Sequence, residues 1–129
     1  MQSGGKILIA YGVKREMENL IERKSFDFAV KIVELYRFLT GEQRETVLSK
    51  QLLRSGTSIG ANVSEAERGQ TKADFRSKMC IALKEANETQ YWIRLLYKTN
   101  YISDEKFKEL NKEVEELISI LVAITKNTK

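Results

Sequence analysis

Neither histidine nor proline occurs in this 129-residue sequence, and cysteine occurs only once. The absence of histidine removes the commonest general base and the commonest metal ligand. A di-iron bundle with Glu-x-x-His ligand pairs is excluded for the same reason, and Cys80 lacks the histidine partner that papain-like catalysis requires. The sequence therefore predicts a protein that is not an enzyme, with no catalytic residue, no cofactor and no metal site.

A single cysteine cannot form an intrachain disulfide, which is typical of proteins from a reducing compartment. Long hydrophobic runs are also missing, because no stretch of about 18 apolar residues predicts a membrane span. The segment KILIAY (6–11) is too short and too poorly flanked to be a secretory signal. We therefore expect a cytoplasmic protein with no membrane partner.

The absence of proline, together with many Leu, Lys, Glu, Ala and Arg residues, favours long unbroken helices. Apolar residues recur with helical spacing over residues 25–40 and 44–68, and in two further segments with Thr71 and Ser103 as N-caps. This pattern predicts an all-α protein, an antiparallel up-down-up-down four-helix bundle over residues 25–126. With Ser25 as the first N-cap, residues 1–24 are expected to form a partly disordered or loosely packed N-terminal extension, and residues 127–129 a C-terminal tail.

The segment RSGTSIGANVSEAERG (54–69) is rich in glycine and small residues, as a phosphate-binding loop would be. It lacks the G-x-x-x-x-G-K-[ST] pattern of such a loop. An apolar stripe also runs from Leu48 to Ala66 without a change of phase, which predicts a helix that ends at Gly69. Gly56 and Gly60 each cost this helix about 1 kcal/mol relative to alanine. We therefore expect a neighbouring helix or subunit to approach closely at both glycines.

The segment after Thr71 carries apolar residues on two sides. One side is a heptad seam that predicts the bundle core. The other side predicts a contact beyond the bundle, and hence a homo-oligomer. The predicted oligomer interface combines this second side with the small residues of the preceding helix: Gly56, Gly60, Ala61, Ile81, Trp92 and Leu95.

Positive charge is concentrated in the middle of the chain, although the net charge is only +4. Residues 49–98 contain nine Lys or Arg and five acidic residues, whereas residues 103–118 contain six acidic residues and three lysines. A basic region of this kind favours a polyanionic partner. The candidate phosphate-binding residues, which flank small residues of helix 44–68 or begin the next helix, are Lys50, Arg54, Arg68, Lys72 and Arg76. The alternative is that the small residues admit another helix or subunit and the charges surround that contact.

The stretch LSKQLLRSGTSIGANVSEAERGQTKADFRSKMCIALKEANETQYWIRLLYKTNYIS (48–103) resembles the four-helix bundle family of bacterial 23S rRNA intervening-sequence proteins, also called the S23 family. The resemblance covers about residues 25–126, and its most specific part is the passage from SIGANVSEAERG into the helix ADF…ALKEANE. It implies a homopentamer of four-helix bundles. A related branch, the accessory variability determinant of diversity-generating retroelements, binds nucleic acid and a reverse transcriptase.

The resemblance and the charge pattern together lead to two hypotheses. The first is a non-enzymatic oligomeric scaffold that binds RNA or DNA. The second is a protein–protein adaptor that does not bind nucleic acid.

Overall fold

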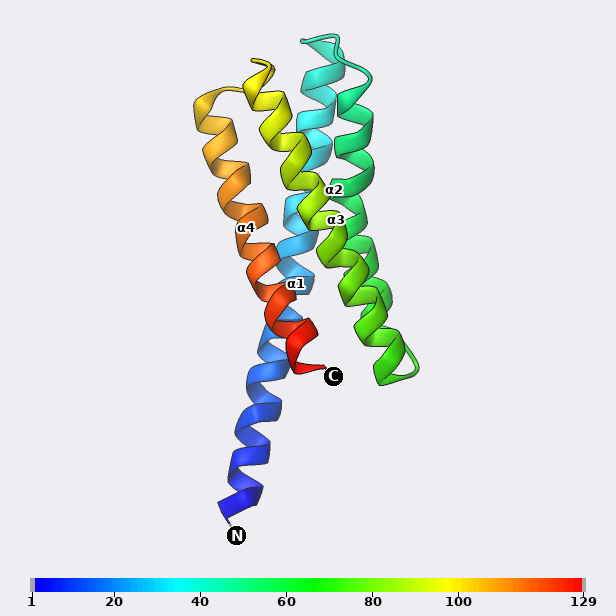
Figure 1. Cartoon of the computed structure of the whole chain (residues 1–129), viewed down its shortest axis with the longest axis vertical. Helices are drawn as coiled ribbons and strands as arrows, with labels where there is room; N and C mark the ends of the chain where they lie inside the picture. The colour runs from blue at the N-terminus through cyan, green and yellow to red at the C-terminus, as the bar shows by residue number, and fades with distance from the viewer. Residues whose placement is uncertain (1, 129) are drawn as a thin grey trace.

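The computed structural model describes residues 2–128, with side chains from residue 12 onward. These residues form four helices: α1 (Gln2–Gly41), α2 (Leu48–Glu67), α3 (Lys72–Lys98) and α4 (Asp104–Asn127). Figure 1 shows that each helix runs in the opposite direction to the one before it, with a short connection at each turn. The predicted all-α four-helix bundle is therefore confirmed.

The core of the bundle lies where the apolar stripes of the four helices meet. α1 contacts α2 and α4, and α3 also contacts α2 and α4. α1 and α3 therefore lie diagonally opposite each other in the bundle. Phe28, Ile32, Ile59, Ile93 and Leu117 are among the side chains with at most 1% of their surface exposed. None of the described helices combines the length and apolar character that crossing a membrane would require.

α1 begins earlier than the sequence pattern predicted. Ser25 lies inside the helix with its side chain buried, and its hydroxyl donates to the Glu22 carbonyl oxygen at 3.2 Å, so it is not an N-cap. Ile21 is fully buried and Met17 packs against the core, so the bundle starts before residue 25. The N-terminal part of α1, drawn in blue in Figure 1, extends past the other helices. The looser packing expected before Met17 stays a prediction, and Met1 lies outside the described residues.

α2 begins at Leu48, four residues later than predicted, because a glutamate before it binds its first amides. The Glu45 carboxylate accepts hydrogen bonds from the backbone N–H groups of Val47, Leu48 and Ser49 at 3.1, 2.8 and 2.7 Å. Burial opposes the ionisation of Glu45, but these bonds outweigh it and lower the pKa of its carboxyl group. Glu45 therefore acts as the cap of α2, although its side chain is not a usual N-cap.

The close neighbour predicted at the two glycines of α2 is α1 of the same chain. A Cβ atom added to Gly56 would lie 2.8 Å from Cγ2 of Ile32, and one added to Gly60 would lie 3.2 Å from the Ser25 carbonyl oxygen. The glycine-containing segment is helical, as predicted, and Gly69 follows the end of the helix. The glycines thus allow α1 and α2 to pack closely within one bundle.

The last two helices begin as predicted. The Thr71 hydroxyl accepts a hydrogen bond from the Asp74 N–H at 3.0 Å, and the Ser103 hydroxyl accepts one from the Lys106 N–H at 3.2 Å. α4 continues to Asn127, and Thr128 is buried, with its hydroxyl donating to the Ile124 carbonyl oxygen. The bundle therefore extends beyond the predicted boundary at residue 126, and Lys129 lies outside the described residues.

Candidate nucleic-acid interface

The five predicted phosphate-binding residues do not form a single patch. Lys50 lies in the first turn of α2, whereas Arg68 and Lys72 lie at the α2–α3 connection. Eighteen residues of helix separate Lys50 from Arg68, which is about 27 Å at the rise of an α-helix. These three side chains are exposed. The other two predicted residues, Arg54 and Arg76, bind groups on neighbouring helices.

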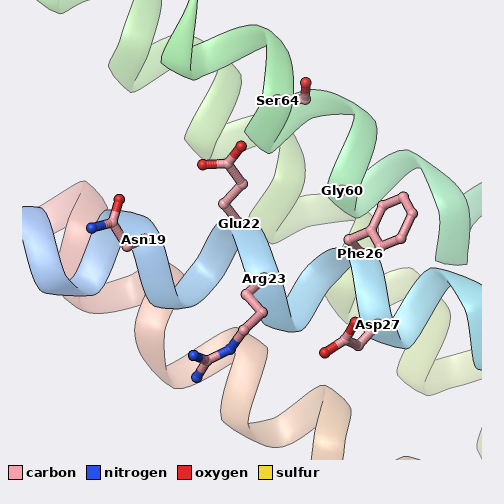
Figure 2. A pocket seen from close by; sticks show the side chains of 7 residues that line it. All are labelled: Asn19, Glu22, Arg23, Phe26, Asp27, Gly60 and Ser64. Atoms are coloured by element: carbon pink, nitrogen blue, oxygen red, sulfur yellow. The ribbon is translucent and has the colours of Figure 1, made fainter.

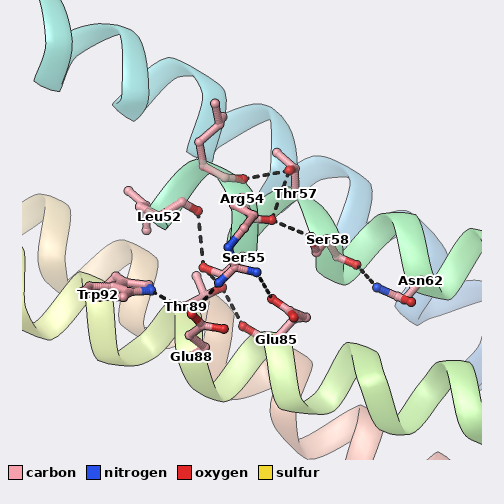
Figure 3. Close-up of polar contacts among 11 residues, drawn as sticks. Leu52, Arg54, Ser55, Thr57, Ser58, Asn62, Glu85, Glu88, Thr89 and Trp92 are labelled. Carbon is pink, nitrogen blue, oxygen red and sulfur yellow. Dashed lines mark hydrogen bonds and ion pairs between the residues drawn. The ribbon is translucent and has the colours of Figure 1, made fainter. Parts of the chain in front are cut away.

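Arg54 connects α2 to α3 through two carboxylates, as Figure 3 shows. Its Nη1 lies 3.3 Å from Oε2 of Glu85, and its Nη2 forms an ion pair with Glu88. The hydrogen bond from Arg54 is the main reason that the pKa of the Glu88 carboxyl group is lowered. The assignment of Arg54 as a phosphate-binding residue stays a prediction, and the structure shows its charge already paired with two carboxylates within the bundle.

Two further cations near the start of α3 also contact the bundle itself. Nε of Arg76 donates to the carbonyl oxygen of Thr125 on α4 at 3.3 Å, and Nζ of Lys78 lies 2.8 Å from the carboxylate of Glu65 on α2. Arg76 is only half-buried, and the group that accepts its hydrogen bond is a neutral carbonyl. Arg76 borders a basic surface of α3 that is centred further along the helix.

That basic surface is the outward side of α3. Lys84, Tyr91 and Lys98 are spaced seven residues apart and so follow one line along the helix, with Arg94 beside them. All four side chains are exposed, and 56% of Tyr91 is accessible. Within the described part of the chain, neither Lys84, Arg94 nor Lys98 forms an ion pair. We call these four residues the α3 basic face.

The acidic residues of α3 leave this face positive. From Phe75 to Lys98 the helix contains two acidic residues, Glu85 and Glu88, and both bind Arg54. The sequence prediction placed its candidates on α2, at the α2–α3 connection and at the start of α3, and it did not include Arg94 or its position beside Tyr91. The seven-residue spacing opposite the core seam was the signal that could have identified this face.

The residues predicted for the oligomer interface have different surroundings. Gly56 is buried under Ile32, so the close contact at this glycine lies within one chain, whereas Gly60 packs on Ser25 but is only half-buried, and a contact between subunits there stays a prediction. Ala61 and Ile81 are exposed, and Leu95 is half-buried. Trp92 packs against the core of its own bundle, and its indole N–H donates to Glu88 at 3.4 Å. An interface through Ala61, Ile81, Trp92 and Leu95 stays a prediction.

An apolar surface on α1 was not predicted from the sequence. Phe26 and Val30 stand one turn apart and are 67% and 44% exposed. A hollow of about 440 Å³ lies beside them, lined by Asn19, Glu22, Arg23, Phe26, Asp27, Gly60 and Ser64. Figure 2 shows the Phe26 ring next to Gly60, a residue of α2 that has no side chain. Phe26 and Val30 lie on the side of α1 opposite its core stripe, and their helical spacing could have predicted this surface from the sequence.

A second hollow lies at the end of the bundle that holds the α1–α2 and α3–α4 connections. Its volume is about 620 Å³, and its apolar lining comes from Leu35, Phe38, Tyr101 and Ile102. Lys31 stands at its edge, bound to Glu113 at 2.8 Å and Glu109 at 3.4 Å. Among the described residues, no three Cys, Asp or Glu side chains are grouped so that they would hold a metal ion.

Comparisons with known proteins identify the family of the chain. A crystal structure from Bacteroides thetaiotaomicron VPI-5482, described as a protein of unknown function from the S23 ribosomal protein family, is 54% identical to it. The match covers 85% of this chain and 98% of that one, with a TM-score of 0.84. A search of curated protein sequences finds no match. Residues 17–123 match the family described as 23S rRNA-intervening sequence protein, and the chain therefore belongs to that family.

Proposed function

We propose that this protein is an oligomeric scaffold that binds nucleic acid through the α3 basic face. The observation that carries the proposal is the division of charge on α3: its two acidic residues between Phe75 and Lys98 bind Arg54, while Lys84, Arg94 and Lys98 remain exposed. A row of exposed cations, in which the Glu88 carboxylate near Lys84 is already paired with Arg54, suits a phosphate backbone, which attracts such residues without regard to base sequence.

Self-association belongs to the proposal because the bundle exposes a separate apolar surface. Phe26 and Val30 lie on α1, diagonally across the bundle from α3. Copies joined through the α1–α2 side would leave the α3 basic face of each copy open. An assembly would then present several such faces at once, which strengthens binding to a long polyanion.

The test is the salt dependence of binding to a structured RNA. Fluorescence anisotropy with a labelled RNA hairpin, at several salt concentrations, yields the slope of log K against log salt. The triple variant Lys84→Gln/Arg94→Gln/Lys98→Gln should reduce that slope by about 2–3, since each lost phosphate contact contributes about 0.9. A matched triple variant, Arg37→Gln/Lys108→Gln/Lys112→Gln, removes the same charge from exposed positions on α1 and α4 outside the hollow beside Phe26 and should leave the slope unchanged.

Arg54→Gln tests the division of charge on α3. Because Arg54 binds Glu85 and Glu88, its loss should lower the thermal midpoint and, by leaving both carboxylates unpaired, also weaken RNA binding at low salt. Equal losses of affinity in both triple variants would mean that only net charge matters. Absence of binding at low salt would contradict the proposed function altogether.

The adaptor hypothesis has support of its own in the hollow at the connection end of the bundle. That hollow combines apolar side chains with charged edges, as sites for peptides and other ligands do. Phe38, which lines it, is 42% exposed. If the protein is an adaptor, Phe38→Ser should abolish capture of a partner encoded by a neighbouring gene, whereas the Lys84, Arg94 and Lys98 substitutions should not.

A further inference from the structure

We infer that the hollow between the end of α3 and the start of α4 receives one unstacked base of a single-stranded nucleic acid. The hollow has a volume of about 320 Å³ and is lined by Tyr91, Arg94, Leu95, Tyr97, Lys98 and Phe107. It adjoins the α3 basic face and shares Tyr91, Arg94 and Lys98 with it. The inference rests on the proposed function and adds the class of nucleic acid that is bound.

Three aromatic rings give the hollow an apolar surface, and one of them, Tyr91, is exposed. The rings of Tyr97 and Phe107 are stacked, with centroids 4.2 Å apart and an angle of 11° between their planes. Tyr91 and Trp92 form a T-shaped pair, with centroids 5.1 Å apart and an angle of 75° between their planes, and more than half of the Tyr91 surface is exposed. Exposed rings of this kind bind bases by stacking, whatever the base.

Two cations in the lining of the hollow can bind phosphates next to a stacked base. Arg94 and Lys98 are four residues apart, so they are neighbours on the surface of α3. Both are exposed, and neither is ion-paired within the part of the chain that the structure describes. No carboxylate lines the hollow, and the nearby Asp104 accepts a hydrogen bond from the Tyr97 hydroxyl at 2.6 Å.

This arrangement favours single strands over duplexes. A base in a duplex is paired and stacked, so it would have to leave the helix before it could contact Tyr91, which costs a few kcal/mol. A single strand has no pairing to break. Contacts with phosphates alone, in contrast, would not depend on the presence of a base.

The experiment compares two labelled strands of equal length and charge, a 12-nucleotide oligouridine and a 12-nucleotide abasic strand. Anisotropy with the full chain should show about tenfold tighter binding of the strand that carries bases, which is within the range for stacking on one ring. Tyr91→Ala should remove this difference, and Tyr91→Phe should keep it. Because Tyr91 is exposed, neither change should alter the fold, which circular dichroism checks. Trp92 is the sole tryptophan, so its emission also reports binding next to Tyr91.

Three results would overturn the inference and leave the proposed function intact. They are equal affinities for the two strands, an unchanged preference in Tyr91→Ala, and binding of a 12-base-pair duplex as tight as that of the single strand. Lys84→Gln serves as the control, because it should weaken binding of both strands equally. If no nucleic acid binds at low salt, the proposed function fails and the inference fails with it.

Discussion

At the scale of single residues, two glycines set the distance between α1 and α2. Gly56 faces the fully buried Ile32, and Gly60 faces the backbone of Ser25. Helical periodicity placed both glycines inside a helix and predicted a close neighbour. It did not identify that neighbour, because periodicity is a local property and the contact joins residues far apart in the sequence. Glycine in these positions is therefore explained by packing within one chain.

Gly56→Ala should lower the free energy of unfolding by about 1–2 kcal/mol, because overpacking at Ile32 exceeds the gain in helix propensity. The new Cβ would lie 2.9 Å from Cγ1 and 3.3 Å from Cβ of Ile32, so rotation of that side chain cannot relieve the contact. Urea denaturation measures the change. Gly12→Ala, with no atom within 4 Å of the new Cβ, should instead be neutral or stabilising. The prediction is wrong if the two variants are equally stable, or if Ile32→Ala does not reduce the cost of Gly56→Ala.

Glu45→Gln should destabilise the protein by about 1 kcal/mol at pH 7, since a neutral amide is a weaker acceptor for the first amides of α2. The pKa of Glu45 is lowered in the folded state, so its stabilising effect is complete above the unfolded value of 4.5 and is lost as the pH falls through the folded value. Thermal melts at pH 7 and at pH 3 should show a difference between wild type and variant that shrinks at the lower pH. Glu42→Gln, which removes a nearby exposed charge, is the control. A difference independent of pH would contradict the capping role.

At the scale of elements, the connections between helices contain the residues with the least favourable backbone conformations. Among the described non-glycine residues, only Arg44 and Asn100 have positive φ angles, 53° and 68°. Asparagine tolerates the left-handed region well, but arginine does not. The sequence pattern placed Arg44 in α2 because nothing in the run before Leu48 marks a helix start. Glu45 supplies that start through its side chain.

Arg44→Gly should raise the free energy of unfolding by about 0.5–1 kcal/mol, because glycine relieves the left-handed strain at a smaller cost in chain entropy. Gln43→Gly is the matched comparison in the same connection. It has no positive φ to relieve, so it should destabilise slightly. Urea denaturation of both variants measures the two effects, and a loss of stability in Arg44→Gly would show that the Arg44 side chain contributes more than its backbone conformation costs.

At the scale of the whole molecule, helix periodicity predicted the bundle and most of its core, because each apolar stripe faces the same interior. The site was harder to predict. Composition placed cations between residues 49 and 98, but their availability depends on pairing across helices, which joins Arg54 to Glu85 and Lys78 to Glu65. The same pairing leaves the outward side of α3 basic. A surface of this kind becomes evident only when the helices are placed next to one another.

The assembly of the molecule is predicted to depend on the apolar surface of α1. Phe26 is the most exposed aromatic side chain among those described, and it borders a hollow beside Gly60 into which a second copy can insert side chains. Light scattering of the wild type at micromolar concentration should give a multiple of the 14.9 kDa chain mass, five times that mass for the pentamer implied by the resemblance.

Phe26→Asp/Val30→Asp should reduce the mass to that of one chain with the helical circular dichroism retained. Ile81→Asp tests the interface predicted from the sequence in the same way, and it should leave the mass unchanged if the contact is made by α1 instead. Dissociation by Ile81→Asp, with Phe26→Asp/Val30→Asp still assembled, would place the contact on α3, and a wild-type protein of 14.9 kDa would contradict self-association.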